Sequence, residues 1–360
     1  MEPPLEGVRV LTVGPGVAAA YAARQFAGFG ADVVHVELAE PSRLSDDQQV
    51  ALLAGGRRVE IGPGQLGELG LAADVVIEDR PPGSLAELGL APAQARAAKP
   101  ALVVVSITPF GQSGPYSAWS AGNAVSFAMG GIMSLTGDPD RPPLLTGGEQ
   151  ALHLGGLHAF GAALCAYYGS LVWGEGDWVD LSLQECAAGM LELYAAGVAY
   201  GEAVPQRLGN HHRAVWGVYH CADGHAGVCC LERQTPALFA CIGDPALDEE
   251  RFRDPAQRLE HDDELTALIA GWVIERTRAE LGALGAAHRV PFGAVESPLE
   301  LLASPGLVER GFFDQLALAE GPAVVPGRPF PGFAWRSPPP LSARGADTTG
   351  VLADWLEARR

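Results

Sequence analysis

The sequence contains almost no lysine: Lys99 stands alone, and the other formal cations are arginines. Acidic residues outnumber Lys and Arg by 43 to 24, which gives a net charge of −19 at neutral pH. This balance argues against a nucleic-acid partner, because nucleic-acid phosphates attract clusters of Lys and Arg. Any site for a polyanion has to be a local patch of arginines.

Long apolar runs are missing as well. No stretch of about eighteen residues is free of charges and of Gly/Pro clusters, so we expect no membrane span. The first residues lack a basic segment followed by an apolar one, so we expect no signal peptide.

Paired cysteines are absent too. The six cysteines form no CxxC pair, which favours a reducing cytoplasm over a disulfide framework. His211, His212, His220 and His225 match no common zinc spacing, so we expect no metal site.

The first part of the chain alternates β-branched runs with helical stretches. A helix from Ala18 to Gly28 follows the first run, and strands are predicted at residues 8–13, 31–37, 74–78 and 101–107. These runs are continuously apolar, as in a parallel sheet covered on both faces, so the sequence predicts an α/β fold. Gly14-Pro-Gly16 is an incomplete GxGxxG and indicates a tight turn, so no nicotinamide cofactor is expected.

A turn-rich segment, Phe110-Gly-Gln-Ser-Gly-Pro-Tyr116, follows the fourth predicted strand. Ligands of open α/β sheets gather beyond the carboxyl ends of the strands, so this loop is well placed for a substrate. The alternative is an ordinary surface turn.

Several motifs together resemble the class III CoA-transferases, the family that also holds carnitine and formyl-CoA transferases and α-methylacyl-CoA racemases. They are the loop at 110–116 and the segments at 4–11, 30–37, 74–90, 129–156, 174–185, 207–211 and 290–295. The resemblance implies a large Rossmann-like domain over residues 1–205, completed by about 315–360, and a smaller α+β domain over 206–314. It also implies two interlocked chains, as a homodimer or as a heterodimer with a paralogue.

The resemblance implies acyl-CoA thioesters and small carboxylic acids as substrates. The CoA-binding residues that it carries over are Arg57, Arg58, Arg80, Phe110, Gly111, Gln112 and Tyr116. The basic contacts are reduced relative to the family, since Gly55 and Glu87 replace polar or basic residues there.

The family's helix after the 129–148 segment opens with Ala-Asp, and that Asp is its nucleophile or acid/base. Here the pair is Ala151-Leu152, and leucine can neither form an acyl anhydride nor move a proton. The position of the racemases' partner residue is held by Asn123.

Two neighbours are candidates to replace the missing carboxylate. If the helix begins by Glu149, then Glu149 and His153 are at i and i+4 and share a face. A glutamate is able to attack thioesters, and a histidine suits acid/base work near neutral pH. The alternative is structural: Glu149 caps the helix N-terminus, and His153 is a polar residue beside it.

Three functions therefore stay open. The first is an enzyme of the transferase class with reassigned residues, catalysing CoA transfer or a related acyl-CoA isomerisation or lyase step. The second is a catalytically silent subunit that pairs with an Asp-bearing paralogue. The third is a family member that was repurposed for another ligand or for a biosynthetic reaction.

Overall fold

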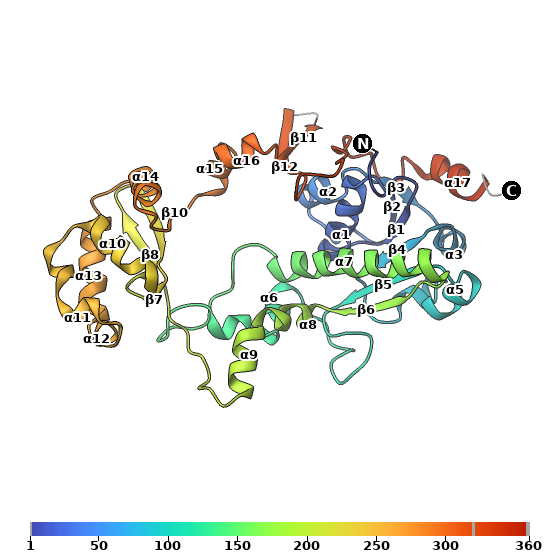
Figure 1. The fold of residues 1–360 in the computed structure, drawn as a ribbon. Coiled ribbons are helices and arrows are strands. Elements are labelled where there is room, and N and C mark those ends of the chain that lie inside the picture. Colours follow the sequence, from blue (N-terminus) through green and yellow to red (C-terminus); the bar gives the residue numbers. More distant parts are fainter. Residues whose placement is uncertain (1, 319–320, 358–360) are drawn as a thin grey trace. The chain divides into compact units, whose positions relative to one another are not determined.

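The computed structural model describes residues 2–318 and 321–357. Its contacts divide the chain into two compact units (Figure 1). One unit holds residues 1–133, 145–204 and 304–360, and the other holds 134–144 and 205–303.

The first unit is built on a six-stranded parallel sheet with the strand order β3-β2-β1-β4-β5-β6. The strands are β1 (Arg9–Val13), β2 (Asp32–Glu37), β3 (Arg57–Glu60), β4 (Val75–Glu78), β5 (Val103–Thr108) and β6 (Trp178–Ser182). Each neighbouring pair is parallel. The predicted α/β fold with a Rossmann-like parallel sheet is confirmed.

Helices cover both faces of this sheet, as the continuously apolar strands require. Alternate residues of the strands enter two separate cores, so that Ile77 packs on one face and Val76 on the other. The first face is covered by α1 (Val17–Gly28), α7 (Gln150–Trp173) and α8 (Leu183–Ala188). The second is covered by α3 (Pro63–Ala72), α4 (Ser84–Glu87), α5 (Pro92–Ala98) and α17 (Thr348–Leu356).

Helices α1 and α7 pack closely because α7 has a glycine, Gly156, where the two helices meet. A β-carbon on Gly156 would lie 2.6 Å from the carbonyl oxygen of Ala18, which only a residue without a side chain avoids. This contact fixes the first turns of α7 against the sheet's first helix. Two short helices, α2 (Asp46–Leu52) and α6 (Asn123–Met129), complete the surroundings of the α7 N-terminus.

The C-terminal part of the first unit returns to the sheet. It contains α16 (Pro305–Glu309), the antiparallel pair β11 (Phe313–Leu318) and β12 (Gly321–Pro326), and then α17 on the second face. The Pro-rich stretch before α17, residues 328–340, is neither helix nor strand, because proline lacks the backbone N–H that both structures use. Asp314 on β11 ties this return to α1, since its carboxylate pairs with the buried guanidinium of Arg24 at 3.0 Å.

The second unit has an antiparallel sheet in the order β10-β9-β8-β7. Its strands are β7 (His211–Arg213), β8 (Trp216–Cys221), β9 (Gly224–Cys229) and β10 (Phe292–Ala294). Its helices are α10 (Thr235–Ile242), α11 (Glu250–Arg253), α12 (Pro255–Glu260), α13 (Asp262–Val273), α14 (Arg278–His288) and α15 (Pro298–Leu301). In the described part of the chain, none of the helices combines the length and the hydropathy that crossing a bilayer requires.

The buried carboxyl group of Glu78 gives the first unit a measurable pH dependence. Burial raises its pKa from 4.5 to about 7, against the opposing effect of its hydrogen bonds to Ser106 and to the backbone of Arg80. The folded chain therefore holds this proton more tightly than the unfolded chain between about pH 4.5 and pH 7. Across that window the free energy of unfolding falls as the pH rises.

We expect Glu78→Gln to remove this contribution, because an amide cannot ionise. Between pH 4.5 and pH 8, the free energy of unfolding of the variant should rise by up to about 3 kcal/mol relative to that of wild type. The figure follows from the rise of the Glu78 pKa from 4.5 to about 7, at about 1.36 kcal/mol per pKa unit. Urea unfolding of both proteins at the two pH values measures the gain. Glu87→Gln, which changes an exposed carboxylate, is the control and leaves the pH dependence as it is.

Candidate functional site at the start of α7

The N-terminus of α7 is capped by a residue from another helix. The side-chain oxygen of Asn123, the first residue of α6, accepts a hydrogen bond of 2.8 Å from the backbone N–H of Ala151. Its amide nitrogen donates to the carbonyl oxygen of Gly148 at 3.3 Å. Among the described residues, no capping bond comes from the side chain of Glu149, which precedes the helix. Glu149 thus occupies the N-cap position that the structural alternative gives it, and the capping hydrogen bond itself comes from Asn123.

The carboxylate of Glu149 is held instead by α2. Nε2 of Gln48 donates a hydrogen bond of 2.5 Å to Oε2 of Glu149. The other end of the same amide is committed, since Oε1 of Gln48 accepts from the backbone N–H of Ser45 in the capping box of α2. The amide therefore has one orientation available, with its donor end toward Glu149. The partly buried carboxylate thus lies in a defined position as a hydrogen-bond acceptor.

His153 stands over the first turn of α7. Its Nδ1 lies 2.9 Å from the backbone carbonyl oxygen of Glu149, and its ring meets that of Tyr21 edge-on at 5.0 Å. A carbonyl oxygen only accepts, so Nδ1 carries the proton and Nε2 is the acceptor atom of the ring. The shared face was predicted for a helix that begins by Glu149, but α7 begins at Gln150, and the contact between the two residues runs through the backbone carbonyl of Glu149 rather than through its carboxylate.

Leu152 occupies apolar surroundings. It packs against a cluster formed by α1 and α2, whose buried members are Val17, Ala20, Leu44, Leu52 and Leu53. A carboxylate at this position would meet aliphatic side chains. The structure therefore brings Glu149, Leu152, His153 and Asn123 together at one helix end, with Gln48 as a further member.

A cleft opens at the carboxyl edge of the parallel sheet. In the strand order β3-β2-β1-β4-β5-β6, successive strands are added on one side of β1 up to β3 and on its other side from β4 onward. The switch point between β1 and β4 is where open α/β sheets bind their ligands. The cleft has a volume of about 630 Å³ and is lined by Glu40, Arg43, Asp79, Arg80, Pro81, Pro82, Pro109 and residues 117–121. Among the predicted CoA contacts, Arg80 lies here.

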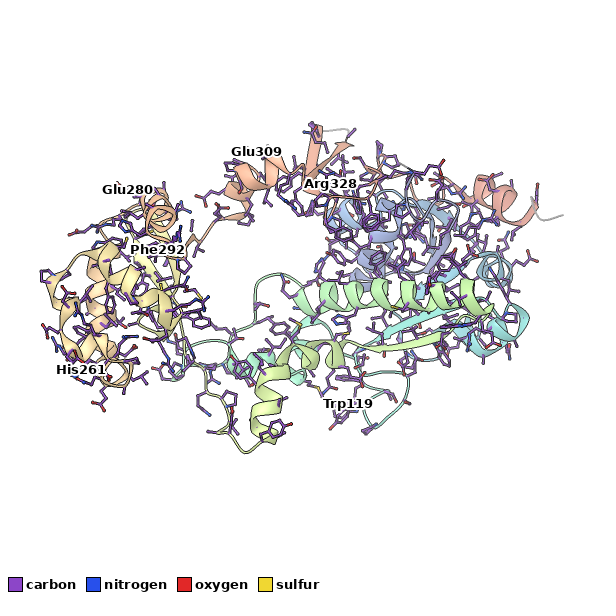
Figure 2. The ribbon with its side chains drawn as sticks, viewed as in Figure 1. Trp119, His261, Glu280, Phe292, Glu309 and Arg328 are labelled. Carbon is purple, nitrogen blue, oxygen red and sulfur yellow. The ribbon has the colours of Figure 1, made fainter. Side chains whose placement is uncertain are left out.

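The loop that carries Phe110–Tyr116 borders this cleft. Its backbone is anchored where the N–H of Gln112 donates to both carboxylate oxygens of Asp180 on β6, at 2.9 and 3.0 Å. Gly111 permits that approach through a positive φ of 86°. The exposed ring of Trp119, which lines the cleft, packs on Tyr116 with centroids 4.4 Å apart (Figure 2).

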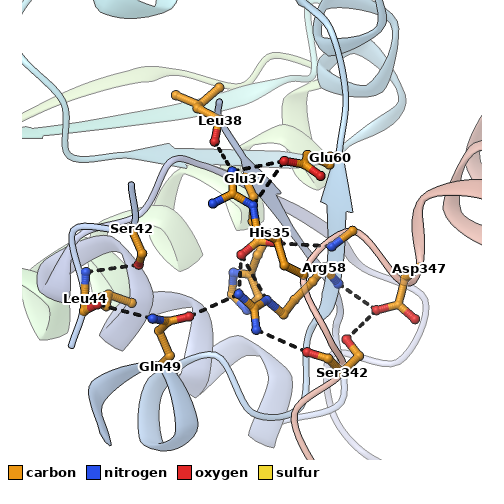
Figure 3. A network of polar contacts seen from close by, with 12 residues as sticks. His35, Glu37, Leu38, Ser42, Leu44, Gln49, Arg58, Glu60, Ser342 and Asp347 are labelled. Carbon is orange, nitrogen blue, oxygen red and sulfur yellow. Dashed lines mark hydrogen bonds and ion pairs between the residues drawn. The ribbon is translucent and has the colours of Figure 1, made fainter. Parts of the chain in front are cut away.

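Arg57 and Arg58 lie elsewhere, in β3, and both already have carboxylate partners. Arg57 pairs with Asp32 and Asp354 at 2.6 Å each. Arg58 is buried and contacts Glu37, while its backbone N–H donates to Asp347 (Figure 3). Either guanidinium would have to share these carboxylates in order to hold a phosphate.

The segment from Arg43 to Gln48 links the two places, because Arg43 lines the cleft and Gln48 contacts Glu149. Gln48, Arg43, Asp79, Trp119 and Asp180 were not among the predicted site residues. The only one with a sequence signal was Gln48, since Ser45 followed by Gln48 is a capping-box pattern. Within residues 2–318 and 321–357, His, Cys, Asp and Glu side chains do not gather in threes around a point fit for a metal ion.

Comparison with known proteins identifies the class that this fold and site define. The model of CoA-transferase family III matches residues 61–348, so the chain belongs to that family. The resemblance inferred from the sequence is confirmed.

Two CoA-transferases and one solved structure are similar to the chain over most of its length. The chain is 30% identical over 329 residues to succinyl-CoA–D-citramalate CoA-transferase of Chloroflexus aurantiacus, covering 85% of this chain and 82% of the relative. It is 28% identical to succinate–glutarate CoA-transferase of Agrobacterium fabrum, covering 91% of this chain and 88% of the relative. A solved structure of a CaiB/BaiF family protein from Brucella suis superimposes with a TM-score of 0.87 at 26% identity, covering 99% of this chain and 100% of that one.

Proposed function

We propose that this chain transfers CoA between carboxylic acids and uses the carboxylate of Glu149 in place of the aspartate that the family places at Leu152. The observation that carries the proposal is that two different side chains make the two contacts at the α7 N-terminus. Asn123 accepts the capping hydrogen bond from the helix, and Gln48 donates a hydrogen bond to the Glu149 carboxylate, which supports a free and positioned carboxylate.

The chemistry follows from a positioned carboxylate. A Glu149 oxygen attacks the thioester carbonyl, the C–S bond breaks, and a mixed anhydride and CoA thiolate result. The thiolate then attacks the glutamyl carbonyl, releases the free acid and leaves a glutamyl-CoA thioester. The incoming acid repeats the sequence in reverse and departs as its CoA thioester. His153, with Nε2 as an acceptor, supplies acid/base capacity beside the carboxylate.

The relatives suggest which substrates to test first. Their names combine succinyl-CoA or succinate with citramalate or glutarate. We therefore propose succinyl-CoA as donor and a small dicarboxylic acid as acceptor, in the reducing cytoplasm. Arg80 and the loop at 110–116 are the CoA contacts that we propose at the cleft. Arg57 and Arg58 are able to bind a CoA phosphate only if each also keeps its present carboxylate partners.

A dimer is part of the proposal, either of identical chains or with a paralogue. Helix α9 (Glu192–Ala199) and its flanks expose large apolar side chains, among them Leu193 at 78% and Tyr200 at 90%. Surfaces of this kind are typical of protein–protein contacts. We expect light scattering at micromolar concentration to give twice the chain mass of 37.5 kDa. A monomer mass would contradict the dimer of identical chains.

A second candidate is a silent subunit paired with an Asp-bearing paralogue. The apolar surroundings of Leu152 and the prior pairing of Arg57 and Arg58 favour it. A member repurposed for another ligand is the third candidate.

Calorimetric titration with CoA and with succinyl-CoA, followed by a transfer assay with glutarate, separates the three candidates. Binding with transfer supports the enzyme. Binding without transfer supports the silent subunit, and absence of binding supports the repurposed member.

A further inference from the structure

The backbone N–H groups at the start of α1 bind a carboxylate from the chain itself, that of Asp79. Asp79, the first residue after β4, has a side chain that is only 8% exposed. Its carboxylate accepts hydrogen bonds from the backbone N–H groups of Gly16 at 2.7 Å and Ala19 at 3.1 Å. Arg43 adds a third, charged donor at 2.8 Å.

This is the position at which an open α/β sheet receives phosphate. The first helix after β1 points its N-terminal N–H groups at the crevice between β1 and β4, and such groups bind phosphate in nucleotide-binding folds. Here Asp79 takes those donors, and the packing leaves no spare room. A β-carbon on Gly16 would lie 2.8 Å from the Asp79 carboxylate and 3.0 Å from the Arg43 guanidinium.

The charges of the adjoining cleft are also balanced, because each of its arginines is paired with a carboxylate of the chain. Arg43 is paired with Asp79, and Arg80 is paired with Glu40 at 2.6 Å. Both arginines that line the cleft therefore have carboxylate partners before any ligand arrives. The remaining lining is proline, small residues and the exposed face of Trp119, which suits an uncharged group better than a polyanion.

We propose that Asp79 is a specificity-determining residue: it fills the anion position at the start of α1 and denies that position to the phosphates of a ligand. The cleft then accepts an uncharged part of its ligand, and any diphosphate lies outside the first turn of α1. This inference rests on the proposed function only in taking a CoA thioester as that ligand. The exclusion of phosphate by Asp79 does not depend on turnover.

Pyrophosphate is the probe that tests the exclusion, with calorimetry on the full chain as the readout. We expect wild type to bind it weakly, because a second anion would meet the Asp79 carboxylate. Asp79→Asn keeps a hydrogen-bond acceptor and loses the charge, so it removes the anion that repels a ligand phosphate and that pairs with Arg43. We expect its affinity for pyrophosphate to rise about tenfold or more.

Asp248→Asn is the matched control. It makes the same chemical change and the same change in net charge at an aspartate that pairs with Arg253 instead. We expect it to bind pyrophosphate as weakly as wild type does. Asp79→Ser, which also offers a short capping oxygen, replaces Asp79→Asn if circular dichroism shows that the latter does not fold.

The proposal is overturned if wild type binds pyrophosphate as tightly as the Asp79 variants. It is also overturned if Asp248→Asn gains as much affinity as they do, because the gain would then reflect net charge alone. A wild type that fails to bind CoA, together with a gain in the Asp79 variants, refutes the proposed function and leaves the exclusion standing.

Discussion

Replacing Glu149 by glutamine is expected to lower the rate of CoA transfer about a thousandfold or more, because an amide oxygen cannot form the anhydride. The fold should survive, since the capping hydrogen bond of α7 goes to Asn123 and the new amide still faces Gln48. Steady-state transfer from succinyl-CoA to glutarate measures the loss, and thermal unfolding checks the fold.

Glu175→Gln is the control for this experiment, because it makes the same change at an exposed position just beyond the other end of α7. It should retain the wild-type rate. A Glu149→Gln variant that retains its activity would contradict the assignment. Activity retained in Glu149→Gln combined with His153→Ala would remove both reassigned residues from the mechanism.

Placing an aspartate at Leu152, where the resemblance expects one, should destabilise the protein and should not speed up transfer. Leu152→Asp removes an aliphatic side chain from the cluster with Val17, Ala20 and Leu52 and leaves a carboxylate against those groups. We expect a loss of about 2 kcal/mol in the free energy of unfolding, and no increase in the rate of transfer. Urea unfolding and the same transfer assay measure the two effects.

Leu152→Asn separates shape from charge, since it has nearly the shape of aspartate and cannot ionise. We expect it to lose somewhat less stability than Leu152→Asp and to leave transfer equally unimproved. A Leu152→Asp variant that transfers CoA about a hundredfold faster than wild type would show instead that the apolar cluster adapts to the aspartate.

The central parallel strands could be predicted from the sequence because their residues are apolar on both faces. The two edge strands could not. β3 begins with two arginines, whose guanidinium groups reach carboxylates on β2 and in the C-terminal return, and β6 is exposed at alternate positions beside a long helix. Edge strands often carry polar and charged residues, which prevent pairing with other chains. A search for continuous apolar runs therefore does not detect them.

The candidate site was predictable only in part, for a similar reason. The Ala-rich pattern located Glu149, Leu152 and His153 near the start of one helix, but it did not show that Glu149 precedes the first helical residue, Gln150. The partners of that helix end come from far along the chain: Gln48 is 101 residues from Glu149, and Asn123 is 28 residues from Ala151. The partnership of Asp79 with the start of α1 is of the same long-range kind. No local pattern specifies such contacts.

The most direct test of the account is to trap the acylated side chain. Wild-type protein is incubated with succinyl-CoA, then treated with borohydride or hydroxylamine, and peptide mass spectrometry locates the modified residue. The account predicts modification of Glu149, absent from Glu149→Gln and present in Glu175→Gln. Transfer activity with the modification on another carboxylate, or with no modified carboxylate, would contradict it.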